Sequence, residues 1–242
     1  MLLACCLAGC KWTDGQKNVA FLAGREVEQY SPEDRPSYWG RPMYVTGVPN
    51  FQKVTDDLYR GDEPTENGVK NLAAMGVRTI VCIRALHSTE IRTWGLPLKY
   101  EQITMWAWQP KDEYVVEFLK IMKDPANRPV FVHCYTGGDR VGLFVAVYRV
   151  AFCGWTKMEA EREMLYGGGG FHQILIKYLV PYFDSLDIDE MMRRAGMTDT
   201  DVTQNDRKGA MPRPILPAPE GPTNDAASAP PDVAVRVWGP VR

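Results

Sequence analysis

Two hydrophobic periodicities run through residues 57–196 of this chain. Short apolar runs indicate buried strands, and apolar residues spaced three and four positions apart indicate helices. The predicted strands cover residues 57–60, 79–83, 100–104 and 130–132. The predicted helices cover residues 65–75, 110–122, 141–152, 156–166 and 171–194. Because strands alternate with helices, the pattern predicts an α/β three-layer sandwich with a small, mainly parallel central sheet flanked by helices.

Local signals refine the helical part of this prediction. Residues 141–152 are almost wholly apolar, which is typical of a buried central helix. Thr156 and Glu159 have the spacing of a capping box and predict the start of the next helix. Gly196 predicts the end of the last helix. The four glycines at 167–170 are interpreted as a turn between two helices; the alternative is a flexible rim beside a functional loop.

Composition divides the 242-residue chain into four parts. Residues 1–10 are short and mainly apolar, and residues 11–43 mix charged residues with glycine, proline and tyrosine, as in a spacer that partly packs on a domain. Residues 44–196 carry the periodic patterns of a folded domain. Residues 197–242 are rich in proline and alanine and are predicted to be disordered.

Charge and hydropathy argue against two classes of protein. The chain has 28 basic and 30 acidic residues, a net charge of −2, and no long basic run, so nucleic acid is not an expected partner. It has no run of about 18 apolar residues, so no membrane-spanning helix is predicted. With 45% hydrophobic residues, a domain of this length can bury a substantial core.

The most specific feature is the run His-Cys-Tyr-Thr-Gly-Gly-Asp-Arg at residues 133–140, between an apolar strand and an apolar helix. Five residues separate Cys134 from Arg140, and glycines at 137 and 138 let successive backbone N–H groups turn inward around one tetrahedral oxyanion. The helix that starts near Arg140 directs its positive end to the same place. These dipoles and the guanidinium are expected to hold Cys134 as a thiolate, which is the nucleophilic form.

This run resembles the signature loop of the cysteine-dependent phosphatases of the tyrosine and dual-specificity superfamily, His-Cys-x-x-Gly-x-x-Arg. The similarity extends over roughly residues 50–190, and the loop is its specific motif. The resemblance implies a dual-specificity phosphatase-like fold and a two-step reaction. Cys134 attacks phosphorus to form a thiophosphoryl enzyme, which water then hydrolyses. Arg140 holds two equatorial oxygens, for which its planar fork is suited.

The same resemblance implies roles for the rest of the loop. His133 orients the loop and supports the thiolate through hydrogen bonds. The phosphate-binding residues are Tyr135, Thr136, Gly137, Gly138, Asp139 and Arg140. No cofactor and no metal ion is implied.

Two candidates remain for the general acid that protonates the leaving oxygen. Relatives usually place an aspartate on a loop after an earlier strand, where this chain has Ala107. Asp112 is the nearest replacement, although an acid in the first turn of a helix also has an ordinary capping role. Asp139, inside the loop, is the other candidate. Val141 stands where relatives often carry a hydroxyl that helps sulfur to leave, and Thr136 is the candidate substitute.

These features predict a phosphatase that acts on a phosphorylated protein or a small phosphomonoester. The loop has no lysine to neutralise several phosphates, which favours phosphotyrosine or dual specificity over inositol phosphates, the alternative substrate class. Trp106 and Trp108 are interpreted either as an aromatic wall beside the site or as caps on the core. The second functional alternative is a phosphate-binding module with little turnover, which Ala107 and Val141 favour.

Cys82 lies on the strand before the expected acid loop. Some members of the superfamily protect their nucleophile by a disulfide with a cysteine on a comparable strand, so Cys82 is a candidate redox partner of Cys134. The alternative is a buried structural thiol.

Leu7, Ala8, Gly9 and Cys10 resemble the cleavage and lipidation box of bacterial lipoproteins. This resemblance implies removal of residues 1–9, acylation of Cys10 and a lipid-anchored location in the bacterial cell envelope. The apolar segment is shorter than an ordinary signal core and no basic residue precedes it, so a cytoplasmic location is the alternative.

Overall fold

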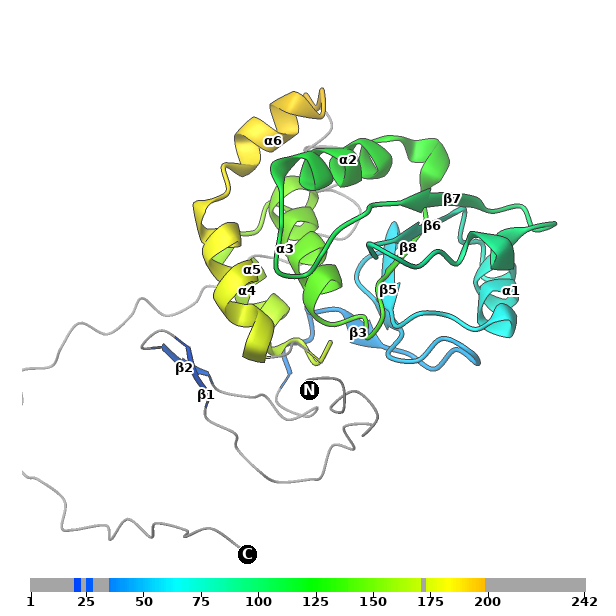
Figure 1. Cartoon of the computed structure of the whole chain (residues 1–242), viewed down its shortest axis with the longest axis horizontal. Coiled ribbons are helices and arrows are strands. Elements are labelled where there is room, and N and C mark those ends of the chain that lie inside the picture. Colours follow the sequence, from blue (N-terminus) through cyan, green and yellow to red (C-terminus); the bar gives the residue numbers. More distant parts are fainter. Residues whose placement is uncertain (1–19, 23–24, 28–34, 171–172, 199–242) are drawn as a thin grey trace, which may run out of the picture. The chain divides into compact units, whose positions relative to one another are not determined.

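A six-stranded sheet forms the centre of the domain (Figure 1). The computed structural model describes residues 20–22, 25–27, 35–170 and 173–198. The sheet contains β3 (Arg41–Pro42), β4 (Gln52–Lys53), β5 (Leu58–Gly61), β6 (Thr79–Cys82), β7 (Lys99–Gln102) and β8 (Val130–His133), in the order β3-β4-β5-β8-β6-β7. Two short antiparallel strands, β1 (Ala20–Leu22) and β2 (Arg25–Val27), form a separate pair.

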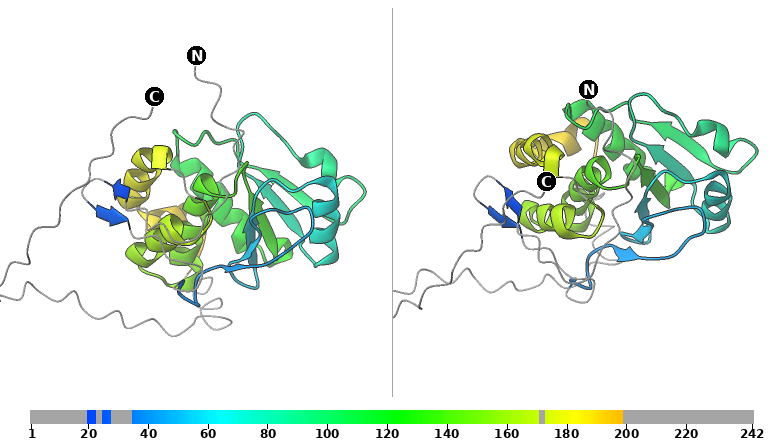
Figure 2. Two further views of the ribbon diagram at one scale, coloured as in Figure 1. Left: turned by 90° about the horizontal axis from the view of Figure 1, so that it is seen from below. Right: turned by 60° about the horizontal axis from the view of Figure 1, so that its bottom comes forward.

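Helices cover both faces of the sheet, so the predicted sandwich is confirmed (Figure 2). The α-helices are α1 (Glu66–Ala74), α2 (Asp112–Lys123), α3 (Asp139–Cys153), α4 (Lys157–Tyr166), α5 (Gln173–Ser185) and α6 (Ile188–Arg194). Two 3₁₀ turns, η1 (Glu90–Thr93) and η2 (Pro125–Asn127), lie in connecting segments. Helix α1 packs on one face, and α2 to α6 gather on the other.

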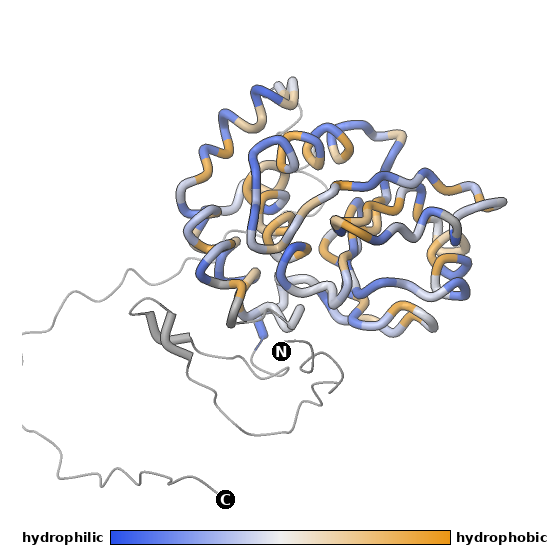
Figure 3. The backbone as a smooth tube through the Cα atoms, in the orientation of Figure 1, coloured by the Kyte–Doolittle hydropathy of each residue, from blue (hydrophilic) through white to orange (hydrophobic). Residues whose placement is uncertain are grey.

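The two faces are built from alternate residues of the same strands. Ile80 of β6 and Phe131 of β8 pack with α1, whereas Val81 and Val132 belong to the larger core under α2 to α6. All four side chains are fully buried. Successive side chains of a strand point to opposite faces, so one strand supplies both cores. Figure 3 shows hydrophobic residues concentrated in these strands and in α3.

The sheet is parallel at its centre and antiparallel at one edge. Strands β5, β8, β6 and β7 pair in parallel, while β3 with β4 and β4 with β5 are antiparallel. The edge strands β3 and β4 were not predicted, because two residues each are too few to show a period of two. At the carboxyl ends of the parallel strands, Gly61 of β5 and Cys82 of β6 both lie in register with His133 of β8. This carboxyl edge of the parallel strands is where ligands bind in open α/β sheets.

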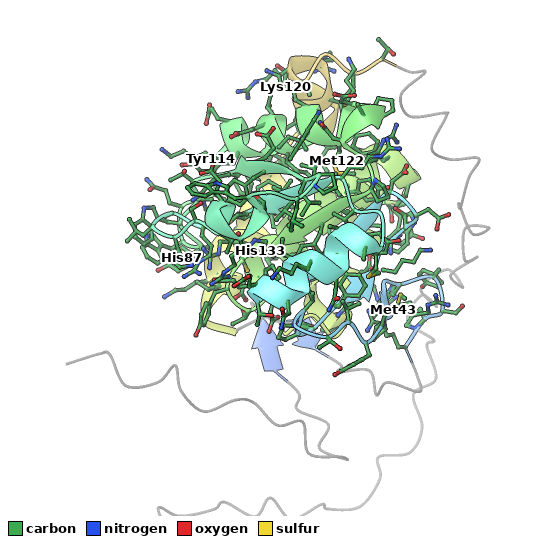
Figure 4. All side chains as sticks on the ribbon, turned by 90° about the vertical axis from the view of Figure 1, so that its right-hand side faces the viewer. Met43, His87, Tyr114, Lys120, Met122 and His133 are labelled. Atoms are coloured by element: carbon green, nitrogen blue, oxygen red, sulfur yellow. The ribbon has the colours of Figure 1, made fainter. Side chains whose placement is uncertain are left out.

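Most predicted helix ends are confirmed. The Thr156 side chain accepts from the Glu159 amide and the Glu159 side chain accepts from the Thr156 amide, as a capping box requires. Gly196 directly follows Ala195, the C-cap residue of α6, and has a positive φ of 70°. Helix α2 begins at Asp112, two residues after the predicted start at Pro110. In Figure 4, Met122 of α2 lies within the domain and Lys120 points outward, as their positions on an amphipathic helix predict.

Helix α3 is buried along nearly its whole length, as its composition predicts. Phe144 of α3 meets Phe118 of α2 edge to face, with ring centroids 5.0 Å apart. Among the described residues, no helix is long and apolar enough to cross a membrane. The predicted leader, including Cys10, and nearly all of the predicted tail lie outside the described residues.

Candidate active site

The predicted phosphate loop joins the end of β8 to the start of α3. Residues 134–138 form the loop, and Asp139 is the first residue of the helix. No side chain caps the start of α3, where Gly138 is the N-cap residue. A helix start without a side-chain cap leaves backbone N–H groups available for an anion. Since β8 and α3 are both buried, the loop between them is fixed at each end.

Five consecutive carbonyl groups of this loop are held by hydrogen-bond donors. The acceptors are the carbonyl oxygens of Cys134, Tyr135, Thr136, Gly137 and Gly138. Their donors, in the same order, are the His133 ring at 3.0 Å, the Glu63 amide at 3.3 Å, the Asn50 side chain at 3.2 Å, and Arg60 Nη2 at 2.7 Å and 3.2 Å. The sequence did not identify Asn50, Arg60 or Glu63, because they lie far from the loop along the chain.

These donors determine where the loop's amides point. The only cis peptide bond among the described residues is Arg128-Pro129, so the loop peptides are trans. In a trans peptide the carbonyl and the following N–H point in opposite directions. Holding the carbonyls of 134–138 therefore turns the N–H groups of 135–139 to the other side of the loop. Within the described chain, none of the amides of 135–138 donates to a protein acceptor. The loop can therefore offer several N–H groups to one anion.

Cys134 and Arg140 lie at the two ends of this loop. Cys134 is 1% exposed. The Nη1 of Arg140 makes a long contact of 3.5 Å to the carbonyl oxygen of Met105, and its Nε is buried without a hydrogen-bond partner in the described chain. A buried guanidinium donor is costly unless an acceptor meets it. An oxyanion bound by the loop amides would supply that acceptor.

His133 is buried beneath the loop and is neutral. Burial lowers its pKa to about 4. Because the Cys134 carbonyl can only accept, Nδ1 donates to it, and Nε2 accepts from the Thr89 hydroxyl at 3.2 Å. The Cys134 carbonyl thus fixes the tautomer, and Thr89, which is itself buried, adapts its hydroxyl to it. No local sequence signal marked Thr89, which precedes η1. The supporting role of His133 stays a prediction, and this geometry is the one that role requires.

The two candidate acids differ in their surroundings. Asp112 accepts from the Tyr182 hydroxyl at 3.0 Å through Oδ1, and its Oδ2 lies 3.4 Å from a guanidinium nitrogen of Arg194. Its carboxylate thus joins α2 to α5 and α6. Asp139 is 5% exposed and directly precedes Arg140 in the first turn of α3. The assignment of the general acid remains a prediction for both residues.

Cys82 ends β6 in register with His133. Its side chain is buried, its Sγ lies 3.7 Å from the carbonyl oxygen of His87, and burial raises its pKa. Within the described chain, Cys82, Cys134 and Cys153 are not joined in disulfides. The redox pairing of Cys82 with Cys134 stays a prediction.

Aromatic side chains stand around the loop. Tyr135 is 54% exposed, and the Arg84 guanidinium lies 5.2 Å from its ring centroid. Trp106 and Trp108 follow Met105, with ring centroids 4.9 Å apart, and are 37% and 54% exposed. Each ring therefore presents part of its surface to solvent, and a role beside the site stays a prediction.

The glycine segment 167–170 packs against the phosphate loop. The Asn50 side chain donates both to the Thr136 carbonyl and, at 3.0 Å, to the Gly169 carbonyl. A Cβ on Gly138 would lie 2.3 Å from the Gly170 carbonyl oxygen, so the two backbones touch only because Gly138 has no side chain. The segment therefore follows α4 as the predicted turn and also supports the loop from outside.

A strand, a cradle of backbone amides with a buried cysteine and arginine at its ends, and a buried helix define a phosphatase domain of the cysteine-dependent class. Residues 44–173 match the family model described as the DSP-PTPase phosphatase fused to NAD+ kinase. The chain belongs to this family.

Related proteins carry phosphatase names. The dual specificity protein phosphatase TpbA of Pseudomonas aeruginosa is 31% identical over 124 residues, which are 50% of this chain and 56% of the relative. An inositol diphosphatase of Arabidopsis thaliana is 28% identical over 113 residues, 42% of this chain and 53% of the relative. The chain thus spans about half the length of the curated relatives it matches. A crystal structure of TpbA in complex with phosphotyrosine superposes with a TM-score of 0.59 at 25% identity, covering 67% of this chain and 98% of that one.

Proposed function

We propose that this chain hydrolyses phosphomonoesters through a phosphocysteine intermediate. The Cys134 sulfur attacks phosphorus, the S–P bond forms, and the ester oxygen leaves with a proton from a general acid. Water then attacks phosphorus and gives a proton back to the carboxylate of the general acid, the S–P bond breaks, and inorganic phosphate and the sulfur anion are released. The row of outward-held carbonyls between Cys134 and Arg140 carries the proposal, because it implies inward amides where the phosphoryl oxygens gain charge.

We propose that the chain acts on phosphotyrosine or has dual specificity. The complex of TpbA with phosphotyrosine and the exposed rings of Trp106, Trp108 and Tyr135 support an aromatic leaving group. Inositol phosphates are the second candidate. Two observations support inositol phosphates as substrates. One is the inositol diphosphatase relative, and the other is the pair of cations Arg84 and Arg92, which contact Glu63 beside the loop.

For the general acid we propose Asp139 rather than Asp112. The carboxylate of Asp112 joins α2 to α5 and α6 through Tyr182 and Arg194, and Asp139 directly precedes Arg140 in the first turn of α3, next to the loop that binds the phosphoryl group. Val141 supplies no hydroxyl for breakdown of the intermediate, and Thr136 is the nearest loop residue that carries one. Slow breakdown, as in a phosphate-binding module with little turnover, is the functional alternative.

Turnover of p-nitrophenyl phosphate by the full chain, with orthovanadate as inhibitor, tests the proposal. We expect hydrolysis that vanadate blocks and that Cys134→Ser abolishes. Cys153→Ser is the matched control, since Cys153 is the last residue of α3, about 20 Å along the helix from its start. Phosphate binding by Cys134→Ser without any hydrolysis by wild type would favour the binding module instead. Comparing a phosphotyrosine peptide with an inositol polyphosphate separates the two substrate classes.

We also propose that Cys10 carries a lipid anchor that places the phosphatase at the bacterial cell envelope. The support is the box Leu7, Ala8, Gly9 and Cys10, which lies outside the described residues.

A further inference from the structure

Arg60 is the only side chain found to hold two carbonyls of the phosphate loop in the described part of the chain. Its Nη2 donates to Gly137 at 2.7 Å and to Gly138 at 3.2 Å. The residue is 2% exposed, and burial lowers its pKa to about 10, so the guanidinium is still charged at neutral pH. By the peptide geometry described above, these bonds direct the amides of Gly138 and Asp139 toward the anion side.

Glu163 of α4 is the carboxylate that balances this buried charge. It is 2% exposed and accepts from Arg149 Nε at 2.6 Å and Nη2 at 2.8 Å. Burial alone would raise the pKa of Glu163, but the Arg149 guanidinium brings it below the usual value. Its negative charge also raises the pKa of Arg60 against the effect of burial. Removing such a carboxylate leaves buried cations uncompensated.

The segment 35–40 completes the surroundings of Glu163. The Gly40 amide donates to Glu163 Oε1 at 2.5 Å. The Arg35 guanidinium donates to the Gly40 carbonyl and, at 3.2 Å, to Gln52 Oε1. Trp39 is buried beside them. This segment precedes the 44–173 span that defines the family, yet it contacts the charge group behind the phosphate loop.

Arg60 also has little room on its other side. A Cβ on Gly169 would lie 2.3 Å from Arg60 Nη2, and Gly169 itself is not in the left-handed region. An alanine at 169 is therefore compatible with the backbone but collides with the end of the Arg60 side chain. It displaces that guanidinium while leaving the charges of the cluster in place.

We propose that Arg60 is a positioning residue for phosphate binding, and that residues 35–40, through Glu163, take part in holding it. The proposal rests on the proposed phosphatase function. Arg60 lies behind the loop and acts on the phosphate only through the orientation of the Gly138 and Asp139 amides.

The first test is Gly169→Ala in the full chain, with inhibition of aryl phosphate hydrolysis by inorganic phosphate as the readout. We expect the phosphate inhibition constant and KM to rise about tenfold, as for loss of one charge-assisted hydrogen bond. The control is Gly76→Ala, where a Cβ meets nothing within 4 Å but the φ of 86° strains an alanine, so this variant should lose stability without displacing Arg60. A purely structural role would lower the thermal midpoint but leave phosphate affinity of the folded protein unchanged.

The second test addresses the link to Glu163. Glu163→Gln is compared with Glu159→Gln on the same helix, where glutamine can still serve the capping box. We expect weaker phosphate inhibition for Glu163→Gln only. If this variant does not fold, Arg35→Ala removes a half-buried guanidinium of the segment and is expected to weaken phosphate inhibition in the same direction.

The outcomes separate the two proposals. The role of Arg60 is overturned if wild type hydrolyses aryl phosphate and the folded variants keep its phosphate inhibition constant to within about twofold. The variants in question are Gly169→Ala and either Glu163→Gln or Arg35→Ala. That result leaves the proposed function intact. Wild type that neither binds phosphate nor hydrolyses the ester overturns both.

Discussion

At the scale of single residues, the site depends on polar groups buried with defined partners. His133 is held between the Cys134 carbonyl and the Thr89 hydroxyl, so one tautomer of the neutral ring satisfies both neighbours. Protonation would place a donor at Nε2 and an uncompensated charge in the core. The ring can therefore orient the loop without taking part in proton transfer.

The low pKa of His133 predicts a pH-dependent stability. The unfolded histidine titrates near 6.5 and the folded one near 4, so between these values the unfolded chain binds the extra proton. This contribution to the free energy of unfolding therefore falls by about 2 kcal/mol from pH 7.5 to pH 5. Urea unfolding at both pH values measures it, and His133→Asn should reduce the difference by that amount.

Other groups do not obscure this comparison. Burial raises the pKa of Asp62 to about 6, and such a group has the opposite sign, since it destabilises the fold as pH rises through the window. Asp62 is present in wild type and in His133→Asn, so its contribution to the free energy of unfolding cancels when the pH dependences of the two proteins are compared. An unchanged pH dependence in His133→Asn would show that the buried histidine does not titrate as described.

The two candidate acids predict different leaving-group effects. Asp139→Asn is expected to lower kcat about a hundredfold for phenyl phosphate and much less for p-nitrophenyl phosphate, whose leaving group needs no proton. Asp112→Asn, in which the Tyr182 contact can be kept, should leave both rates nearly unchanged. The reverse pattern would assign the acid to Asp112.

At the scale of elements, α4 ties the phosphate loop to the segment before β3. It begins at the Thr156 capping box, carries Glu163, and is followed by the glycine segment that touches Gly138. A change at the start of this helix therefore tests stability separately from binding, because the cap lies on the opposite end from the loop.

Loss of the cap should weaken the helix and spare the site. Thr156→Ala removes the side-chain acceptor for the Glu159 amide and is expected to lower the free energy of unfolding by about 1 kcal/mol. Thr156→Ser retains the hydroxyl and is the control. Chemical denaturation measures the change, and the phosphate inhibition constant should stay that of wild type in both variants.

At the scale of the whole molecule, the proposed lipid anchor would hold the domain at a membrane. The proposed acylation of Cys10 leaves residues 11–34 between the lipid and Arg35, which bonds to the domain. The anchor would then lie close in sequence to the segment that supports Glu163.

Lipidation predicts a change in partitioning. In a bacterium that processes lipoproteins, the full chain should incorporate labelled fatty acid and enter the detergent phase of Triton X-114. Cys10→Ser should abolish both, because a thioether-linked lipid needs the sulfur. Cys5→Ser, outside the lipidation position, is the control. Equal partitioning of wild type and Cys10→Ser into water would support the cytoplasmic alternative.

The sequence by itself determined the local features of this protein. The spacing of Cys134 and Arg140, the apolar run of α3 and the Thr156 capping box each depend on residues a few positions apart, so their physics is visible in a short window. The order of strands and helices predicted the sandwich for the same reason. The two-residue edge strands escaped prediction because they contain no full period.

Only the tertiary structure decided which residues hold the loop. Asn50 reaches Thr136 across 86 positions, Arg60 reaches Gly137 across 77, and Gly40 reaches Glu163 across 123. No local pattern links such residues, since their contacts arise when β5, α4 and the segment before β3 pack behind β8. Buried carbonyls and charges require partners, and the fold determines which residues supply them.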